Sequence, residues 1–206
     1  MDGRRARREQ NRAAVLDALA ELYREGNYEP SAAEIAERAG LSPRSLFRYF
    51  DDVDDLNRAT IDQQLERARP LLAVDARPGD PTATKVERLV EARLRLYDAI
   101  APVARAARIC AWRHPVIARQ VASSRSYLRH QLERLFAPEL DALGPERAPA
   151  VLAAMDALCS FEAADLLRVD QRLSRAQAAA ALVQTLTTLL AGAPVAPLQP
   201  PAITSR

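Results

Sequence analysis

Helical periodicity runs through almost all of this 206-residue chain, and no segment alternates polar and apolar residues as a β-strand does. Near the start of the chain, Val15, Leu16, Leu19, Leu22 and Tyr23 fall on one face of a helix. Only six residues are glycine, while Ala, Leu, Arg, Glu and Gln are abundant, and this composition favours helix over sheet. The sequence therefore predicts an all-α fold.

Capping patterns mark where several of these helices begin. In Ser31…Glu34, Thr84…Glu87 and Ser174…Gln177, a hydroxyl can accept a hydrogen bond from the third residue's N–H while the Glu or Gln reaches back to the cap. Pro102 is expected to end one helix or open the next. Together these signals predict nine helices, over about residues 7–25, 31–39, 42–48, 53–69, 84–101, 103–113, 115–136, 146–168 and 174–191.

Composition excludes several classes of protein. Apolar residues make up 49% of the chain and charged residues 27%, as in a soluble globular protein. No window of about 18 residues is apolar throughout, and the Arg-rich N-terminus is not followed by the apolar segment of a secretion signal. The two cysteines, Cys110 and Cys159, suggest neither a disulfide framework nor a metal cluster. We expect a reduced, cytoplasmic protein that does not bind a membrane.

Residues 31–50 carry the most specific pattern in the chain. A short helix capped by Ser31 is followed by Gly40, which can adopt the positive φ of a sharp turn. Ser42 is a good N-cap, and Pro43 suits the first position of the next helix. Leu46, Phe47 and Phe50 are expected to face inward. This is the geometry of a helix-turn-helix, whose second helix enters the major groove of DNA with its N-terminus first.

The outward positions of that second helix are suited to DNA. Arg44 and Arg48 can donate two hydrogen bonds to a guanine edge, and Ser45 can bond a base or a phosphate. A plain corner between two helices is the alternative explanation, but cap, glycine, proline and basic outer face all coincide here. Five arginines within residues 4–12 could add phosphate contacts, or could simply be a solvated helix start.

Taken together, these residues resemble the tetracycline-repressor (TetR) family of bacterial transcriptional regulators. The resemblance covers about residues 11–56, and the matching positions are the Ala-rich first helix, Gly26-Asn27-Tyr28, Ser31, Ile35, Ala36, Ala39-Gly40-Leu41-Ser42, Ser45-Leu46-Phe47-Arg48-Tyr49-Phe50 and Leu56. The resemblance implies an all-α homodimer with a three-helix DNA-binding domain and a C-terminal domain that binds a small molecule and dimerises.

The resemblance also implies roles for individual residues. The recognition helix corresponds to about Ser42–Arg48, while Ser31 and Tyr49 correspond to phosphate contacts. The DNA-binding set expected here is therefore Ser31, Ser42, Pro43, Arg44, Ser45, Arg48 and Tyr49. Two positions depart from the family: Val53 stands where a lysine is usual, and Arg44 where a glycine is common. The acidic residues around Val53 are expected to weaken non-specific attraction to phosphates.

Beyond the helix-turn-helix domain, expected at residues 1–52, residues 53–191 are expected to bind the ligand and to dimerise, and residues 192–206 to form a flexible Pro-rich tail. The helix at 174–191 has an apolar stripe but no charged face, which favours burial on most sides. We assign it, with 146–168, to a twofold four-helix bundle, although an interior helix of a monomer is the alternative. The interface residues predicted in this way are Leu152, Met155, Leu182, Leu186 and Leu189.

A ligand cavity is expected among the central helices, because such sites combine apolar walls with a few polar anchors. The candidate lining residues are Tyr97, Arg105, Cys110, Trp112, Arg113, Tyr127 and Phe161. Residues 86–136 hold ten arginines against four acidic residues, which favours an anionic effector such as a carboxylate, with an apolar effector as the alternative. The alternative is that the arginines are solvated and the aromatic rings belong to the core.

The sequence thus predicts a ligand-responsive repressor that binds a pseudo-palindromic operator on double-stranded DNA as a homodimer. An activator or an effector-independent DNA-binding regulator is the alternative, and an enzyme or carrier that uses the helical cavity is less favoured. No catalytic residue, cofactor or metal is predicted, because no Ser/His/Asp set, Gly-rich phosphate loop or paired-carboxylate signature stands out.

Overall fold

The computed structural model describes residues 2–191, and all regular structure in that range is helical, so the predicted all-α fold is confirmed. The predicted tail at 192–206 lies outside the described residues. Within the described range, no helix is long and apolar enough to cross a membrane. The elements are α1 (Asp2–Arg24), α2 (Ala32–Arg38), α3 (Pro43–Leu46), α4 (Val53–Ala68), the 3₁₀ turn η1 (Arg69–Leu72), α5 (Thr82–Ala111), α6 (Pro115–Leu135), α7 (Ala137–Leu158), α8 (Phe161–Asp165), the π-helical turn η2 (Leu166–Asp170) and α9 (Arg175–Leu190).

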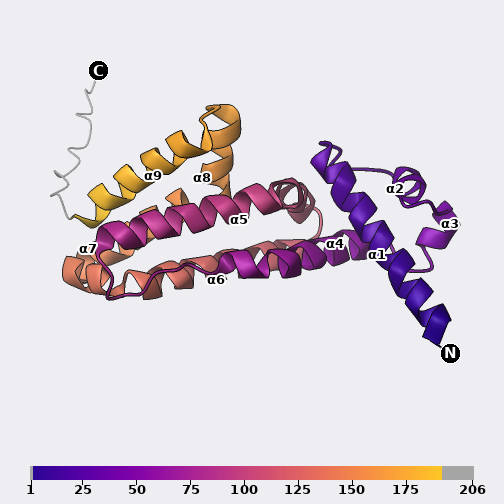
Figure 1. The fold of residues 1–206 in the computed structure, drawn as a ribbon, viewed down its shortest axis with the longest axis horizontal. Helices are drawn as coiled ribbons and strands as arrows, with labels where there is room; N and C mark the ends of the chain where they lie inside the picture. Colours follow the sequence, from indigo (N-terminus) through magenta and orange to yellow (C-terminus); the bar gives the residue numbers. More distant parts are fainter. Residues whose placement is uncertain (1, 192–206) are drawn as a thin grey trace, which may run out of the picture.

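The helices form a small unit at one end of a longer helical body. Figure 1 shows α1, α2 and α3 grouped at the right, with α4 leading from them into the body, where α5 and α6 run lengthwise. Towards the opposite end, α9 packs on α5 and α7. Helix α4 contacts both α1 and α5, so it connects the two parts.

Two apolar clusters make up the core, and they do not divide at the expected domain boundary between residues 52 and 53. The first cluster contains Leu19, Ile35 and Leu46 of the small unit, but also Val103 near the end of α5 and Ile117 of α6. The second cluster joins α5 through α9. The C-terminal part of α5 therefore packs directly against the small unit.

Helix α5 differs from the prediction, because it continues through Pro102 instead of ending there. Proline removes one intrahelical hydrogen bond and usually kinks or ends a helix. Here the flanking residues are held by burial: Val103, Ala104, Ala106 and Ala107 all pack in one of the two clusters. Tertiary packing therefore outweighs the local cost, and the two predicted helices are one.

The predicted helix at 146–168 is also divided differently. Helix α7 begins at Ala137, and it is broken internally at Gly144, whose φ of 78° only glycine adopts readily. The chain then turns at Ser160, whose hydroxyl accepts a hydrogen bond from the N–H of Ala163 at 3.1 Å and so starts α8. This early turn swings α8 across α5, and it brings Glu162 to the cavity described below.

Candidate functional site

Helices α2 and α3 meet through a short turn that the local sequence dictates. Gly40 has a φ of 68°, and the backbone N–H of Leu41 donates to the carbonyl of Ala36 at 2.8 Å, which closes the end of α2. Ser42 caps α3 by accepting from the N–H of Ser45 at 3.2 Å. The structure therefore has the helix-turn-helix that residues 31–50 predict.

Helix α3 is shorter than expected, ending at Leu46 instead of Arg48, and residues 47–49 continue as 3₁₀-like turns. The side chains of Pro43, Arg44 and Arg48 are exposed, while Ser45 is half-buried, with its hydroxyl 2.9 Å from that of Ser42. Arg44 thus lies on the exposed first turn of α3, the part of a recognition helix that reaches base edges.

Phe47 corrects the prediction that it would face inward. Its side chain is 48% exposed, whereas its neighbours Leu46 and Phe50 are buried. Because α3 ends before Phe47, the helical phase used to place it inside does not apply. An exposed phenylalanine beside a recognition helix is suited to packing against the methyl group of thymine.

A basic groove lies beside the C-terminal end of α3. It is lined by Arg7, Arg8 and Asn11 of α1 together with Arg48 and Tyr49, and it encloses about 600 Å³. The side-chain amide of Asn11 donates to the Tyr49 hydroxyl at 3.0 Å, which orients the ring. Within residues 2–191, none of the three arginines forms an ion pair with a described acidic side chain, so their guanidinium groups can donate to an anion.

The other end of the helix-turn-helix is already occupied by a carboxylate. The Ser31 hydroxyl donates to Glu34 Oε2 at 2.6 Å, and the backbone N–H of Ser31 donates to the same oxygen at 2.8 Å. These bonds, to which Asn27 adds another, lower the pKa of Glu34. A phosphate that approaches Ser31 would therefore meet a negatively charged group.

The acidic side chains of residues 51–55, beside the recognition helix, mostly form local hydrogen bonds and ion pairs. Asp52 caps α4 by accepting from the N–H of Asp55 at 2.7 Å, and Asp55 accepts from Arg58 at 2.5 Å. Asp54 lies 2.8 Å from His114 at the start of α6. Capping and pairing thus account for these acids, in the way the helix dipole favours near an N-terminus.

A second candidate site is a cavity of about 580 Å³ in the helical body. It is enclosed by α4, α5, α6, the end of α7 and α8, and its walls are mostly apolar. The lining residues are Ile61, Gln64, Leu65, Tyr97, Ile100, Ala104, Ala107, Arg108, Gln120, Val121, Ser124, Arg125, Leu128, Asp156, Ala157, Cys159, Ser160, Phe161, Glu162, Ala163 and Leu166. Its volume lies in the range of small-molecule pockets.

Two of the seven predicted cavity residues line this space. Tyr97 and Phe161 lie in its wall, with their rings 5.7 Å apart in an edge-to-face arrangement. The Tyr97 hydroxyl donates to the carbonyl of Cys159 at 2.6 Å, and burial raises the pKa of this tyrosine.

The other five predicted residues lie outside the cavity wall. Arg105 pairs with Asp165, Cys110 is buried in the first cluster and Arg113 pairs with Glu29. Trp112 is 93% exposed at the end of α5, and Tyr127 is exposed on α6. The prediction grouped these residues by type and by nearness in sequence, but they point away from the face of α5 and α6 that encloses the cavity.

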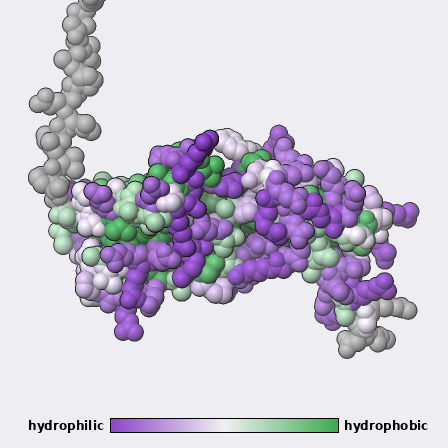
Figure 2. Space-filling view, turned by 45° about the horizontal axis from the view of Figure 1, so that its top comes forward, coloured by the Kyte–Doolittle hydropathy of each residue, from purple (hydrophilic) through white to green (hydrophobic). Residues whose placement is uncertain are grey.

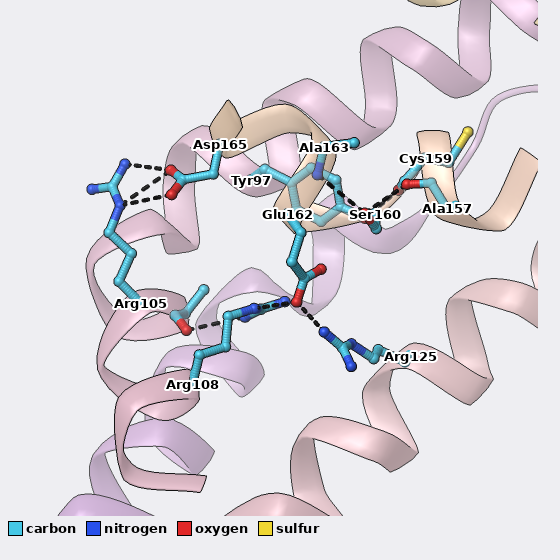
Figure 3. Close-up of polar contacts among 11 residues, drawn as sticks. Tyr97, Arg105, Arg108, Arg125, Ala157, Cys159, Ser160, Glu162, Ala163 and Asp165 are labelled. Carbon is cyan, nitrogen blue, oxygen red and sulfur yellow. Dashed lines mark hydrogen bonds and ion pairs between the residues drawn. The ribbon is translucent and has the colours of Figure 1, made fainter. Parts of the chain in front are cut away.

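The polar wall consists instead of residues that the sequence analysis did not single out. Arg108 Nε donates to Glu162 Oε1 at 2.6 Å, and Arg125 donates to the same oxygen. Figure 3 shows Glu162 reaching from α8 towards both guanidinium groups, which come from α5 and α6. Burial by itself would raise the pKa of Glu162, but the bonds and charges of the two arginines, with the residue's own backbone N–H, lower this pKa to about 2. Glu162 is therefore a carboxylate at neutral pH.

Most residues predicted for the dimer interface are buried within a single chain. Leu152, Met155, Leu182 and Leu186 are buried in the second cluster of a single chain, and Leu189 is half-buried against it. The apolar stripe of α9 packs on its own α5 and α7, so Leu182 and Leu186 are covered by the same chain, while Leu189 keeps part of its side chain accessible. The interior helix of a monomer, which was the alternative, describes the packing of this stripe.

Comparison with known proteins agrees with these features. Residues 15–60 match the profile of "Bacterial regulatory proteins, tetR family". No curated protein sequence matches the chain.

Solved structures resemble nearly the whole chain. A TetR-like transcriptional regulator from Rhodococcus sp. RHA1 is 24% identical, with a TM-score of 0.65 over 90% of this chain and 97% of that one. A transcriptional regulator from Rhodococcus sp. Rha1 is 22% identical, with a TM-score of 0.65 over 92% and 99%. A tetR-family regulator from Streptomyces coelicolor is 19% identical, with a TM-score of 0.63 over 89% and 81%. These likenesses show a shared fold.

An exposed recognition turn, a preceding helix with a basic groove and a separate helical body together define a helix-turn-helix DNA-binding protein. The match over residues 15–60 makes this segment similar to the DNA-binding domain of the tetR family of bacterial regulatory proteins, in agreement with a DNA-binding transcriptional regulator.

Proposed function

We propose that the protein is a homodimeric repressor that reads a pseudo-palindromic operator and releases it when a small molecule fills the cavity. The observation that carries the proposal is the exposed first turn of α3 with Arg44, next to a groove that offers Arg7, Arg8 and Arg48 to an anion. Bases and phosphates of one duplex can meet these two features together. Repression requires no further surface, because a dimer seated on a promoter excludes the polymerase.

We assign base readout and phosphate binding to different residues. Arg44 donates to a guanine edge and Phe47 packs on a thymine methyl group, while Pro43 and the bonded pair Ser42 and Ser45 hold the turn that presents them. Tyr49 and the three arginines of the groove bind phosphates. Ser31 makes at most a weaker phosphate contact, because Glu34 occupies its hydroxyl.

The proposed dimer uses the outer faces of α7 and α9 instead of the buried leucines. On α9, the exposed residues opposite the buried stripe are small or uncharged, and they are Ala176, Ala180, Gln184, Thr187 and Thr188. On α7, Ala150 and Ala153 form a similar exposed face. Small side chains let two helix pairs approach closely, which suits a twofold four-helix bundle.

We further propose that the effector acts through α4 and the end of α5. The cavity is lined by Ile61 and Leu65 of α4, and Ile61 also belongs to the apolar cluster of the small unit. A ligand that favours one placement of α4 therefore changes the spacing of the two recognition helices, in proportion to its differential affinity for the two states. We assign the protein no catalytic activity, and its DNA target places it in the cytoplasm.

Selection of bound genomic fragments tests the proposal. The purified full-length protein is incubated with sheared DNA from its source organism at near-physiological salt, and the retained fragments are sequenced. We expect enrichment of a pseudo-palindrome whose half-sites lie about one helical turn apart or slightly more. Uniform recovery of all fragments, at any salt concentration, would contradict sequence-specific regulation.

The basic groove gives a second expectation, on the salt dependence of binding. Changing Arg7 and Arg8 to Gln removes two cationic side chains per chain from the groove, or four per dimer. If all four contact phosphates, the slope of log affinity against log salt concentration becomes less steep by about 3 to 4. Fluorescence anisotropy across a salt series measures the slope, with Arg119→Gln on α6 as an exposed control. An unchanged slope would show that the groove does not touch DNA.

A further inference from the structure

We propose that the effector is an amphipathic monocarboxylate, whose head group replaces the Glu162 carboxylate between Arg108 and Arg125 and whose tail fills the apolar part of the cavity. This inference rests on the proposed function, because it names the chemical class of the ligand that the cavity takes.

The cavity has one charged end and a long apolar wall. Arg108, Arg125 and Glu162 gather where α8 crosses α5 and α6 (Figure 3). Elsewhere the wall is mostly apolar, with aliphatic side chains such as Ile100 of α5 and Leu128 of α6, and it also includes the uncharged polar residues Gln64, Gln120, Ser124 and Ser160. A ligand that matches both parts has a single polar head and an aliphatic or aryl-alkyl tail.

The charges at the polar end favour an anion. Glu162 accepts from both arginines through one oxygen, and the other lining carboxylate, Asp156, is 3.3 Å from Arg129. Three guanidinium groups therefore face two carboxylates, which leaves one positive charge uncompensated by these side chains. A carboxylate ligand balances it, whereas a cationic ligand adds to it.

Arg108 is held ready for such an exchange. Its guanidinium group lies 4.3 Å from the centre of the Phe161 ring, and it also donates to the carbonyl of Ala104 at 3.0 Å. These contacts keep the guanidinium in place when its carboxylate partner changes. Arg125 is more exposed, with 57% of its side chain accessible, so an incoming carboxylate can reach it from the solvent side of the pair.

Loss of the Glu162 contacts removes bonds that hold α8 on α5 and α6. Helix α8 is also connected to the DNA-binding unit. One turn after Glu162, Asp165 accepts from Arg105 at 2.6 Å, and both Asp165 and Tyr28 raise the pKa of Arg105. Tyr28 precedes α2 and lies 6.4 Å from Tyr23, ring centre to ring centre, beside the buried core of that unit. The π-helical turn η2 follows α8 directly, and such turns mark segments that depart from regular helix at functional sites.

Calorimetric titration of the full-length protein tests the ligand class. The probes are the straight-chain carboxylates from hexanoate to dodecanoate, 4-phenylbutyrate, and the uncharged amide of each. We expect at least one carboxylate to bind about tenfold or more tightly than its amide, because charge-assisted bonds to two arginines are lost in the amide. Arg125→Gln should abolish this preference, and Glu162→Gln should strengthen carboxylate binding by removing the internal competitor. Arg119→Gln is the matched control and should change neither.

The outcomes separate this inference from the proposed function. Equal binding of carboxylates and amides, or no binding of any probe, overturns the carboxylate inference while leaving DNA binding intact. Failure to select an operator overturns the proposed function without changing the calorimetric result. Where both hold, the preferred carboxylate should release the selected operator from the wild-type protein. Arg105→Gln should retain carboxylate affinity but resist release, and unimpaired release in this variant overturns the route through α8.

Discussion

Replacing Arg44 by alanine is expected to lower the affinity for the selected operator by about 30-fold to 10⁴-fold, while binding to unrelated DNA falls far less. Arg44 is exposed on the first turn of α3, and a dimer presents two copies. Each bidentate contact with guanine contributes about 1–3 kcal/mol of discrimination, so two contribute about 2–6 kcal/mol.

Electrophoretic mobility shift against operator and scrambled duplexes, at a fixed salt concentration, measures both affinities. Arg119→Ala is the control for loss of one positive charge, since Arg119 is exposed on α6. Arg48→Ala offers a sharper contrast, because Arg48 lines the groove. This substitution should lower the affinities for operator and for scrambled DNA by similar factors. If Arg44→Ala instead behaves like Arg48→Ala, Arg44 binds phosphate and the base contact belongs to another residue.

The helix-turn-helix could be predicted because its determinants are local. Ser31, Gly40 and Ser42 act through hydrogen bonds and backbone angles within a few residues, and the structure has each of them in the expected role. Phe47 shows where this reasoning stops. Its exposure depends on where a four-residue helix ends, and the sequence pattern alone does not distinguish a last helical turn from a 3₁₀ turn.

The cavity was harder to predict, and Pro102 is the main cause. Tyr97, Ile100, Ala104 and Arg108 share one face of α5 only if the helix continues through the proline. If the helix is predicted to break at Pro102, the sequence no longer indicates that Tyr97 and Arg108 lie on the same face. The pairing of Arg108 with Glu162 also depends on the turn at Ser160. The predicted helix at 146–168 runs through this position, so the prediction contains no turn there.

The interface prediction rests on a weaker kind of signal. An uncharged helix is buried on several sides, but the sequence does not say which side meets the same chain and which meets a partner. In the structure, the leucine stripe of α9 packs in the core of the protomer, and the face with Ala and Thr residues is exposed. A stripe of small residues gives a weak hydrophobic signal, so the sequence pattern favours the larger leucines as interface residues.

Leu186→Ala is expected to lower the free energy of unfolding by about 2–5 kcal/mol, whether or not the protein is a dimer. Leu186 is fully buried in the second cluster of one chain, so truncation leaves a cavity there. Ala180→Arg, on the exposed face of the same helix, is expected to convert the dimer to monomers that remain folded. Urea unfolding followed by circular dichroism measures stability, and sedimentation velocity measures assembly, with Ala122→Arg on α6 as the surface control.

Combining the two substitutions decides between the core and the interface roles. If Leu186 stabilises the protomer, Leu186→Ala lowers the free energy of unfolding by the same amount in the Ala180→Arg chain as in the wild-type chain. The reason is that Leu186 then acts on folding and Ala180 on dimerisation. If Leu186 were an interface residue, its cost would disappear once the chain is monomeric, and its effect on stability would depend on protein concentration. Additivity, together with dissociation by Ala180→Arg alone, would place the twofold contact on the small-residue faces of α7 and α9 and keep the leucine stripe within each protomer.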